Sequence, residues 1–188
     1  MRRFASIALL ALASACATHV PTAVPTAVKP PPSWPLLPPG TLGHAAQVRQ
    51  ILHAAFQSRT VDLQCVVTVD GDRLTVVGLN TLGLRAFKVS YDGVRIDQQR
   101  APQVPAFVDG ARLIEDIQLA FWPLAALQSA LAPAGWTVAE PFPGTRRLLH
   151  DDALIAEVHY ATADPWSGRV WLVNLRDRYS LSIDTSAL

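Results

Sequence analysis

The side chains best suited to acid–base or metal chemistry gather at His150-Asp151-Asp152. These residues separate two apolar stretches with strand character, and aspartate is common in tight turns because its carboxylate bonds nearby backbone amides. A hairpin turn therefore explains them better than a metal site. The sequence contains no Gly-x-Ser-x-Gly, no His-Glu-x-x-His, no phosphate-binding glycine loop and no paired-cysteine metal spacing. We expect a protein that is not an enzyme, with no catalytic residue, resident metal or cofactor.

A second polar pair, Asp116 and Gln118, interrupts a stretch that is otherwise apolar and helical in its spacing. A buried carboxylate needs a partner, because an unpaired charge is costly to remove from water. Arg146 or Arg147 could supply that partner, and Arg147 is our candidate. We interpret Asp116, Gln118 and Arg147 as a buried polar pin between helix and sheet. The alternative is that these side chains contact the polar head group of a bound molecule.

The N-terminus has the order of a secretory signal: Arg2 and Arg3, an apolar run over residues 7–13, and small residues before Cys16. The apolar run is shorter than the roughly twenty residues that a membrane-spanning helix needs. Ala13-Ser14-Ala15-Cys16 resembles the lipobox of bacterial lipoproteins, although Ala13 stands where leucine is usual. The resemblance implies a signal peptide over residues 1–15 and acylation of Cys16. The alternative is an ordinary secretory signal that leaves Cys16 a free thiol.

The residue after this cysteine bears on the location of the protein. By resemblance to lipoprotein sorting rules, an aspartate there would favour the inner membrane, whereas this chain has Ala17. The resemblance therefore implies the outer membrane, with the domain lipid-anchored and facing the periplasm. Two or three acyl chains make such an anchor stable, whereas one chain is marginal. The second cysteine, Cys65, lies in an apolar strand pattern and is expected in the core.

The charges of the chain are nearly balanced. Of 16 Lys and Arg residues, Arg2 and Arg3 leave with the signal peptide, so 14 basic side chains remain beside 15 acidic ones. This balance provides no positive field that would hold nucleic acid. We therefore expect no nucleic-acid partner.

Residues 16–40 comprise the lipidated cysteine and a proline-rich linker. Eight prolines between positions 21 and 39 disfavour both helix and sheet. Extended polyproline rises about 3.1 Å per residue, so the linker could reach roughly 70 Å. The linker either lets the domain reach a partner or is only a passive connection between the anchor and the folded domain. The globular domain is expected over residues 41–188.

Hydrophobic spacing predicts helices and two antiparallel meanders in that domain. Apolar residues at helical intervals predict an amphipathic helix over residues 42–58, and further helices are expected over 111–121 and 123–131. Alternating apolar residues and turn pairs such as Asp92-Gly93 predict strands on either side of the later helices. The nine expected strands are 61–69, 74–79, 84–91, 94–96, 136–140, 145–150, 153–161, 169–175 and 179–184.

Nine antiparallel strands with this much apolar surface are expected to curl, because a flat sheet would leave its edges and an apolar face exposed. We predict a mainly β (α+β) fold: a strongly curved antiparallel sheet forming an incomplete barrel, with an N-terminal helix and two helices between the meanders covering a cavity. A filled core is the alternative. Trp166, on a turn-rich loop, is either folded back or exposed as a contact for a membrane or partner. The residues expected to line the cavity are Phe87, Val89, Leu113, Ile117, Phe121, Trp122, Leu127, Trp136 and Trp171.

Three segments carry a family resemblance: Glu115-Asp116-Ile117-Gln118-Leu119-Ala120-Phe121-Trp122-Pro123, then Arg146-Arg147-Leu148, then Trp171-Leu172-Val173-Asn174 with Tyr179-Ser180-Leu181-Ser182-Ile183. Over roughly residues 55–185 the chain resembles an uncharacterised family of bacterial lipoproteins associated with aryl-polyene biosynthesis clusters. That family in turn resembles the periplasmic carrier LolA and the outer-membrane receptor LolB. Those proteins have an open half-barrel that helices close over a hydrophobic cavity for acyl chains. The exposed leucine that the receptor uses in lipoprotein handover has no match here.

The anchor, the linker, the predicted cavity and the resemblance together indicate an outer-membrane lipoprotein that binds or transfers acyl chains or lipidated molecules. Its expected partners are lipid or lipoprotein acyl chains, the outer membrane through the lipid anchor, and envelope proteins. The alternative is a non-enzymatic scaffold lipoprotein that docks an envelope complex and has a filled core.

Overall fold

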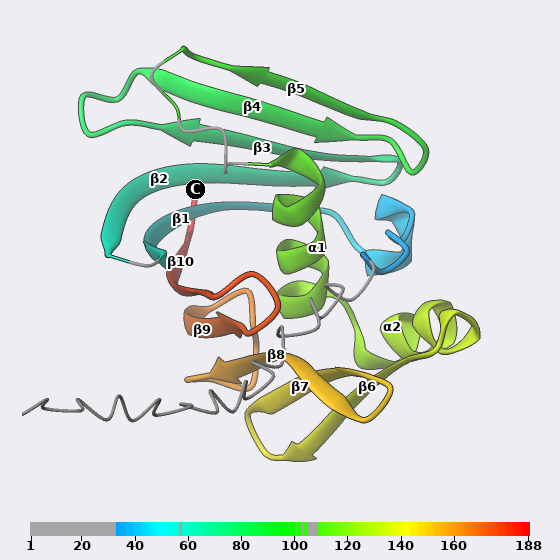
Figure 1. Ribbon diagram of the computed structural model, residues 1–188. Coiled ribbons are helices and arrows are strands. Elements are labelled where there is room, and N and C mark those ends of the chain that lie inside the picture. Colours follow the sequence, from blue (N-terminus) through cyan, green and yellow to red (C-terminus); the bar gives the residue numbers. More distant parts are fainter. Residues whose placement is uncertain (1–32, 57, 103, 105–108) are drawn as a thin grey trace, which may run out of the picture.

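A computed structural model describes residues 33–56, 58–102, 104 and 109–188. In these residues ten antiparallel strands form one strongly curved sheet, in the order β5-β4-β3-β2-β1-β10-β9-β8-β7-β6 (Figure 1). The strands are β1 Ala46–Phe56, β2 Arg59–Asp70, β3 Arg73–Leu79, β4 Arg85–Tyr91, β5 Ile96–Arg100, β6 Trp136–Phe142, β7 Thr145–His150, β8 Ala153–Tyr160, β9 Gly168–Asn174 and β10 Tyr179–Ala187.

The sheet consists of two meanders, β1–β5 and β6–β10, that meet where the first and last strands pair. Residues Val48–Phe56 of β1 lie opposite Tyr179–Ala187 of β10. β5 and β6 form the two edges, so the described part of the sheet is curved but not closed into a barrel. The prediction of a mainly β fold with two meanders and a curled sheet is confirmed, and eight of the nine predicted strands are present. The strand predicted over residues 94–96 is wrong apart from Ile96, because the amides of Val94 and Arg95 bond Asp92 in the turn before β5.

The helix predicted over residues 42–58 is wrong: most of this segment is β1, a central strand. Its exposure alternates with period two, and Val48 and Leu52 point into the core. Two residues make this alternation difficult to recognise in the sequence. Gln50 is polar but buried, where its amide donates to Thr185 Oγ1 at 3.3 Å, whereas apolar Ile51 is 47% exposed on the other face. Exchanging polar and apolar residues between the faces produces apparent helical spacing.

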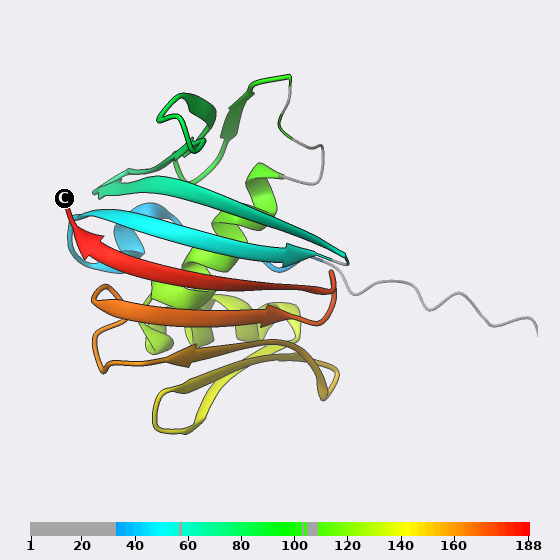
Figure 2. The ribbon, with the colours of Figure 1, turned by 90° about the vertical axis from the view of Figure 1, so that its left-hand side faces the viewer.

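Two helices connect the meanders and cover the concave side of the sheet, as predicted (Figures 1 and 2). Helix α1, Gly110–Phe121, begins at Asp109, whose carboxylate accepts from the amides of Ala111 and Arg112 at 2.8 and 3.1 Å. This cap satisfies amides that have no partner within a helix. From Ile114 onward every residue of α1 is buried. Helix α2, Leu124–Leu131, follows Pro123 and packs on β6.

The folded domain begins before the predicted boundary at Thr41. Trp34 and Leu37 are both buried, and the ring of Trp34 lies 5.5 Å from that of Trp136. Gln118 of α1 bonds the backbone of Leu37 twice, accepting from its amide at 2.9 Å and donating to its carbonyl at 2.6 Å. A short 3-10 helix, Pro39–Leu42, then leads into β1. Residues 1–32, including Cys16 and most of the linker, lie outside the described residues.

Cys65 lies in the core on β2, as predicted. Burial raises the pKa of its thiol to about 12, so the thiol stays protonated at neutral pH. None of the helices in the described part of the chain is long and apolar enough to cross a bilayer.

Candidate functional site

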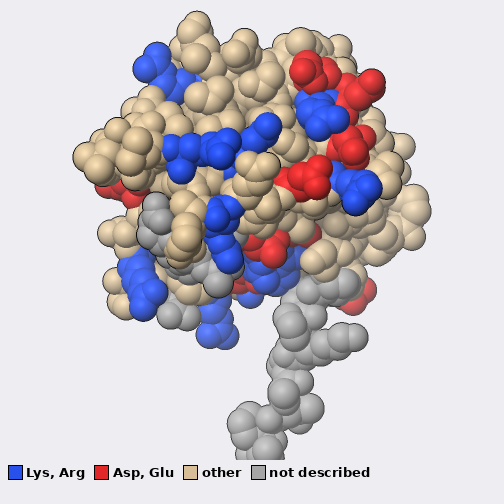
Figure 3. Space-filling view, turned by 90° about the horizontal axis from the view of Figure 1, so that it is seen from above, with Lys and Arg blue, Asp and Glu red and all other residues tan. Residues whose placement is uncertain are grey.

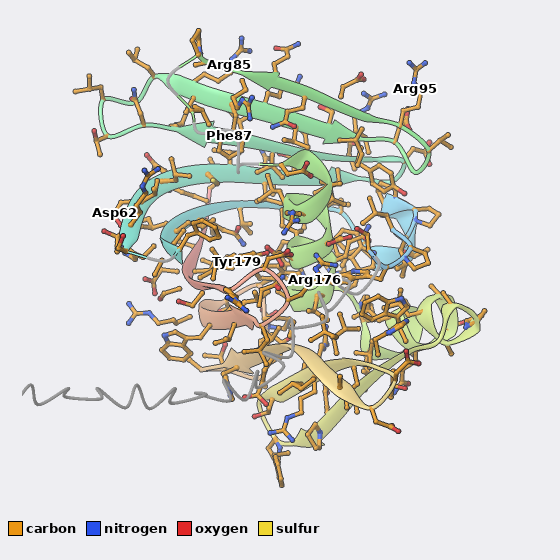
Figure 4. All side chains as sticks on the ribbon, viewed as in Figure 1. Asp62, Arg85, Phe87, Arg95, Arg176 and Tyr179 are labelled. Atoms are coloured by element: carbon orange, nitrogen blue, oxygen red, sulfur yellow. The ribbon has the colours of Figure 1, made fainter. Side chains whose placement is uncertain are left out.

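A cavity of about 500 Å³ lies on the concave side of the sheet, between α1 and the strands. Its wall is mostly apolar and is built by the adjoining ends of β1, β2 and β10, by β4 and by the first two turns of α1. Figure 4 places Phe87 and Tyr179 above and below this region. The lining residues are Leu52, Ala54, Phe56, Val61, Leu63, Phe87, Asp109, Arg112, Leu113, Asp116, Asp177, Tyr179 and Leu181.

Two of the nine predicted lining residues, Phe87 and Leu113, lie in this wall. Phe87 takes its position because its cross-strand neighbour is Gly78. A Cβ atom on Gly78 would lie 2.2 Å from the phenyl ring, so only glycine leaves room for it. Ile117 lines a void of about 10 Å³ that also borders Asp116.

The other predicted lining residues are located elsewhere. Trp171 is 41% exposed on the outer face of β9, so its assignment to the cavity is wrong. The alternation of β9 explains this, because Val170, Leu172 and Asn174 are the residues that point inward. Five of the predicted residues are buried in the core and do not line the cavity: Val89, Phe121, Trp122, Leu127 and Trp136.

The polar end of the cavity reaches the surface at Asp109 and Arg112, which are both exposed. The Arg112 guanidinium forms an ion pair with Asp177. Behind this pair lies Arg176, whose guanidinium donates to Asp177 Oδ2 at 2.8 Å and to Glu115 Oε2 at 2.7 Å. Both side chains of the Arg176–Glu115 pair are less than 5% exposed. Two arginines and two carboxylates thus form a connected network beside the cavity.

Asp116 lies between this network and the apolar wall. Tyr179 Oη donates to Asp116 Oδ2, and Asn174 Nδ2 donates to Tyr179 Oη at 3.0 Å. The other oxygen, Oδ1, is buried without a hydrogen-bond partner among the described residues. Burial raises the pKa of Asp116 to about 7, although the bond from Tyr179 acts in the opposite direction. At neutral pH this carboxyl therefore exists in both protonation states.

Of the three residues of the predicted polar pin, only Asp116 connects the helix to the sheet. Asp116 and Gln118 are buried, but Asp116 bonds Tyr179, and Gln118 holds the N-terminal segment and not the sheet. Arg147 is wrong as their partner: its side chain is 39% exposed and pairs with Glu157. The preceding residue, Arg146, is the buried one.

Arg146 fastens the C-terminal end of α1 to the second meander. Its guanidinium donates to the carbonyls of Leu119 and Trp122 at 2.7 and 2.8 Å and to Glu140. Leu119 lies in the last turn of α1 and Trp122 is its C-cap, so no amide within the helix can satisfy either carbonyl. The Arg146 side chain therefore bonds carbonyls at the C-terminal end of α1 and connects the helix to β7.

The hairpin predicted at His150-Asp151-Asp152 is confirmed. Asp151 and Asp152 have positive φ angles of 49° and 62° between β7 and β8. Such a pair is typical of a two-residue hairpin turn. Across the described residues, no group of three His, Cys, Asp or Glu side chains converges on a possible metal position.

Trp166 is folded back onto the domain. Its ring lies 4.7 Å from that of Phe121 and 6.2 Å from that of His44, and it packs against the core. Of the two alternatives for this loop, the structure therefore has the one in which Trp166 is folded back, and the Trp166 side chain is not fully exposed.

Sequence reasoning missed the residues that make the polar end of the site. Tyr179 was predictable, since the alternation of β10 places it on the same face as Leu181 and Ile183. Arg176 and Asp177 were not predictable, because they lie in the turn before β10, and only the folded chain brings them into contact with Glu115 and Arg112 of α1.

On the face over β3–β5, acidic and basic side chains are both present, in keeping with the near-balanced net charge (Figure 3).

The described residues thus form a curved, unclosed antiparallel sheet with a buried helix across its concave side and a mostly apolar cavity between the two. The chain belongs to the family described as "Protein of unknown function (DUF3261)", whose model matches residues 47–187. The matched residues include all ten strands and both helices, apart from the first residue of β1. No curated protein matches the chain.

Proposed function

We propose that the protein is an outer-membrane-anchored periplasmic lipoprotein that binds or transfers acyl chains or lipidated molecules in its cavity. The observation that carries this proposal is the apolar cavity of about 500 Å³. This volume falls within the range of about 300–1,000 Å³ that is usual for small-molecule sites. Wall residues such as Leu63, Phe87 and Leu181 would contact the methylene groups of a chain.

The physical basis of binding is the removal of apolar surface from water. Each methylene group that enters the cavity contributes about 0.8 kcal/mol. Part of this gain offsets the entropy that the chain loses on immobilisation. An acyl chain suits the site because its length lets it follow a wall built from several strands and one helix.

The proposed anchor rests on the sequence. The signal-like residues 1–15 and the lipobox-like Ala13-Ser14-Ala15-Cys16 support acylation of Cys16, and Ala17 supports the outer membrane. The resemblance to lipoproteins associated with aryl-polyene biosynthesis, and through them to LolA and LolB, supports a role with acyl-bearing cargo. A curved sheet with helices on its concave side agrees with that layout.

The second candidate, a scaffold that docks an envelope complex, is favoured by the outer face of the sheet. Ile51, Trp171 and Val173 are exposed there by 47, 41 and 38%. A scaffold with a filled core is less well supported, because the cavity leaves the core incomplete.

A pair of tryptophan substitutions in β1 tests the cavity. Ala54 lines the cavity, whereas the next residue, Ala55, points to the outer face and is exposed. Successive residues of a strand face opposite sides, so Ala54→Trp places a large side chain inside the cavity and Ala55→Trp adds the same side chain outside. The Cys16→Ser chain, which cannot be acylated at that position, is titrated with the uncharged fluorophore N-phenylnaphthylamine.

We expect the parent chain and Ala55→Trp to bind the fluorophore alike and Ala54→Trp to bind it at least about tenfold more weakly, a loss of about 1.4 kcal/mol. Circular dichroism of both variants checks that they fold. Equal binding by a folded Ala54→Trp variant would place the ligand elsewhere and refute the proposal.

A further inference from the structure

Asp116, one of the residues that line the cavity, has a buried carboxylate oxygen, Oδ1, without a partner among the described residues. Asp116 is only 6% exposed, and its side chain borders both the main cavity and the small void beside it. Oδ1 has no hydrogen-bond partner among the described residues. Leaving a buried polar atom unpaired is costly, and such atoms in native proteins call for an explanation.

The carboxyl group is held in a fixed orientation. Tyr179 donates to Oδ2, Asn174 donates to Tyr179 at 3.0 Å, and Asn174 Oδ1 in turn accepts from the amide of Asp177 at 3.0 Å. This chain of bonds connects α1 to β10 and to the turn before it. Because these bonds hold Oδ2, Oδ1 is the oxygen of Asp116 that remains buried without a partner among the described residues.

The charges around this atom restrict what could bond it. Three carboxylates, of Asp109, Asp116 and Asp177, line the cavity beside a single cationic side chain, that of Arg112. Arg112 already forms an ion pair with Asp177. Arg176, which does not line the cavity, is shared between Glu115 and Asp177. A carboxylate or phosphate head group would therefore meet net negative charge, and like charges close together repel.

We propose that Asp116 Oδ1 binds the uncharged polar group, a hydroxyl or an amide N–H, of a single-chain acyl amphiphile whose chain lies along the apolar wall. This inference rests on the proposed function and specifies its ligand class. An uncharged donor satisfies the ionised carboxylate, and a hydroxyl also accepts a hydrogen bond from the protonated acid. A hydroxyl can therefore be bound in both protonation states of Asp116, whereas an amide N–H bonds only the ionised form.

A competition experiment tests the ligand class. The Cys16→Ser chain is loaded with N-phenylnaphthylamine at pH 8, and decanol, decanamide and decanoate, which share one chain length, displace it. Asp116→Asn removes the charge and keeps an oxygen that can accept from Tyr179. Asp62→Asn is the matched control, because the Asp62 side chain is 66% exposed and Asp62 is not among the lining residues, although its neighbours Val61 and Leu63 are (Figure 4).

The readout is the ratio of the decanoate and decanol concentrations that displace half of the probe, since this ratio cancels differences in probe affinity. We expect Asp116→Asn to lower this ratio at least about tenfold and Asp62→Asn to leave it within about twofold of the parent. A ratio unchanged by Asp116→Asn would overturn the inference, while the cavity proposal would stand. Failure of the probe and of all three decyl compounds to bind the parent would refute the proposed function, and the inference with it.

A second measurement needs no substitution at Asp116. In protein carrying ¹³C at aspartate carboxyl carbons, decanol is expected to shift the Asp116 resonance and to leave that of Asp62 in place. An Asp116 resonance that does not respond to saturating decanol would also overturn the inference.

Discussion

Among the described residues, Asp116 combines burial, a hydrogen bond from Tyr179 and a carboxylate oxygen without a partner. Burial raises the pKa of its carboxyl to about 7, against about 3.9 for an aspartate in an unfolded chain. Between these two values, unfolding releases a proton. The contribution of this group to stability is therefore fully present below about pH 4 and is lost as the pH rises to about 7.

The Asp116→Asn variant should lack this pH dependence. Relative to the parent chain, its free energy of unfolding is expected to rise by on the order of 2–4 kcal/mol between pH 4 and pH 8, because the amide does not ionise. Urea unfolding at several pH values measures the difference. Parallel stability curves for the two proteins would show that Asp116 keeps its ordinary pKa.

Sequence reasoning identified Asp116 as a buried polar residue but could not identify its partner. A carboxylate in an apolar helix indicates a buried residue that needs a partner, because removing an unpaired charge from water is costly in any fold. The choice between Arg146 and Arg147 depended on which of two adjacent residues points inward. The register of β7 decides this, because Arg146 and Leu148 are buried whereas Arg147 faces Glu157. The tyrosine that does bond Asp116 is 63 residues away along the chain.

Among the elements, α1 forms one wall of the cavity and is fixed at both ends. Asp109 caps its first turn, and Arg146 bonds the carbonyls of its last turn. The helix between them carries Leu113 and Asp116 into the cavity. Its placement therefore depends on contacts with both meanders, and a loss at either end would alter the cavity wall.

Replacing Arg146 should destabilise the domain far more than replacing its neighbour. Arg146→Ala leaves the buried carbonyls of Leu119 and Trp122 without a donor and is expected to cost about 2–4 kcal/mol. Arg147→Ala removes a partly exposed ion pair with Glu157 and should cost less than about 1 kcal/mol. Chemical denaturation of the two variants gives both values. Similar losses would contradict the role assigned to Arg146.

The helices between the meanders were predictable, whereas β1 was not. Residues 111–121 have one apolar stripe and a clear end before Pro123, so their local pattern and their tertiary role agree. In β1 the local pattern and the tertiary role disagree, because polar Gln50 is buried and apolar Ile51 is exposed. This strand pairs on both sides with distant strands, β2 and β10, and those pairings override its local pattern.

At the scale of the whole molecule, the first and last strands pair in the middle of the sheet, so both meanders depend on the same junction. The N-terminal segment enters beside α1, held by Gln118 and by the packing of Trp34 on Trp136. The tether that we propose would therefore leave the domain from a fixed point and not from a free end.

The two cysteines provide a matched test of the anchor. We expect Cys16→Ala to abolish incorporation of labelled palmitate and to move the protein from the outer-membrane fraction to the soluble periplasmic fraction. Cys65→Ala should keep both the label and the membrane location, because that thiol is buried in the core. Label retained in the Cys16→Ala variant would contradict a lipid on Cys16.

We propose that the cavity holds an acyl chain, and the contents of the purified protein test this proposal. The Cys16→Ser chain and its Ala54→Trp and Ala55→Trp variants are purified without detergent, extracted with organic solvent and analysed by mass spectrometry. We predict close to one acyl-bearing molecule per protein from the parent and from Ala55→Trp, and a large loss from Ala54→Trp. Protein that is free of lipid, or equal recovery from a folded Ala54→Trp variant, would contradict the claim.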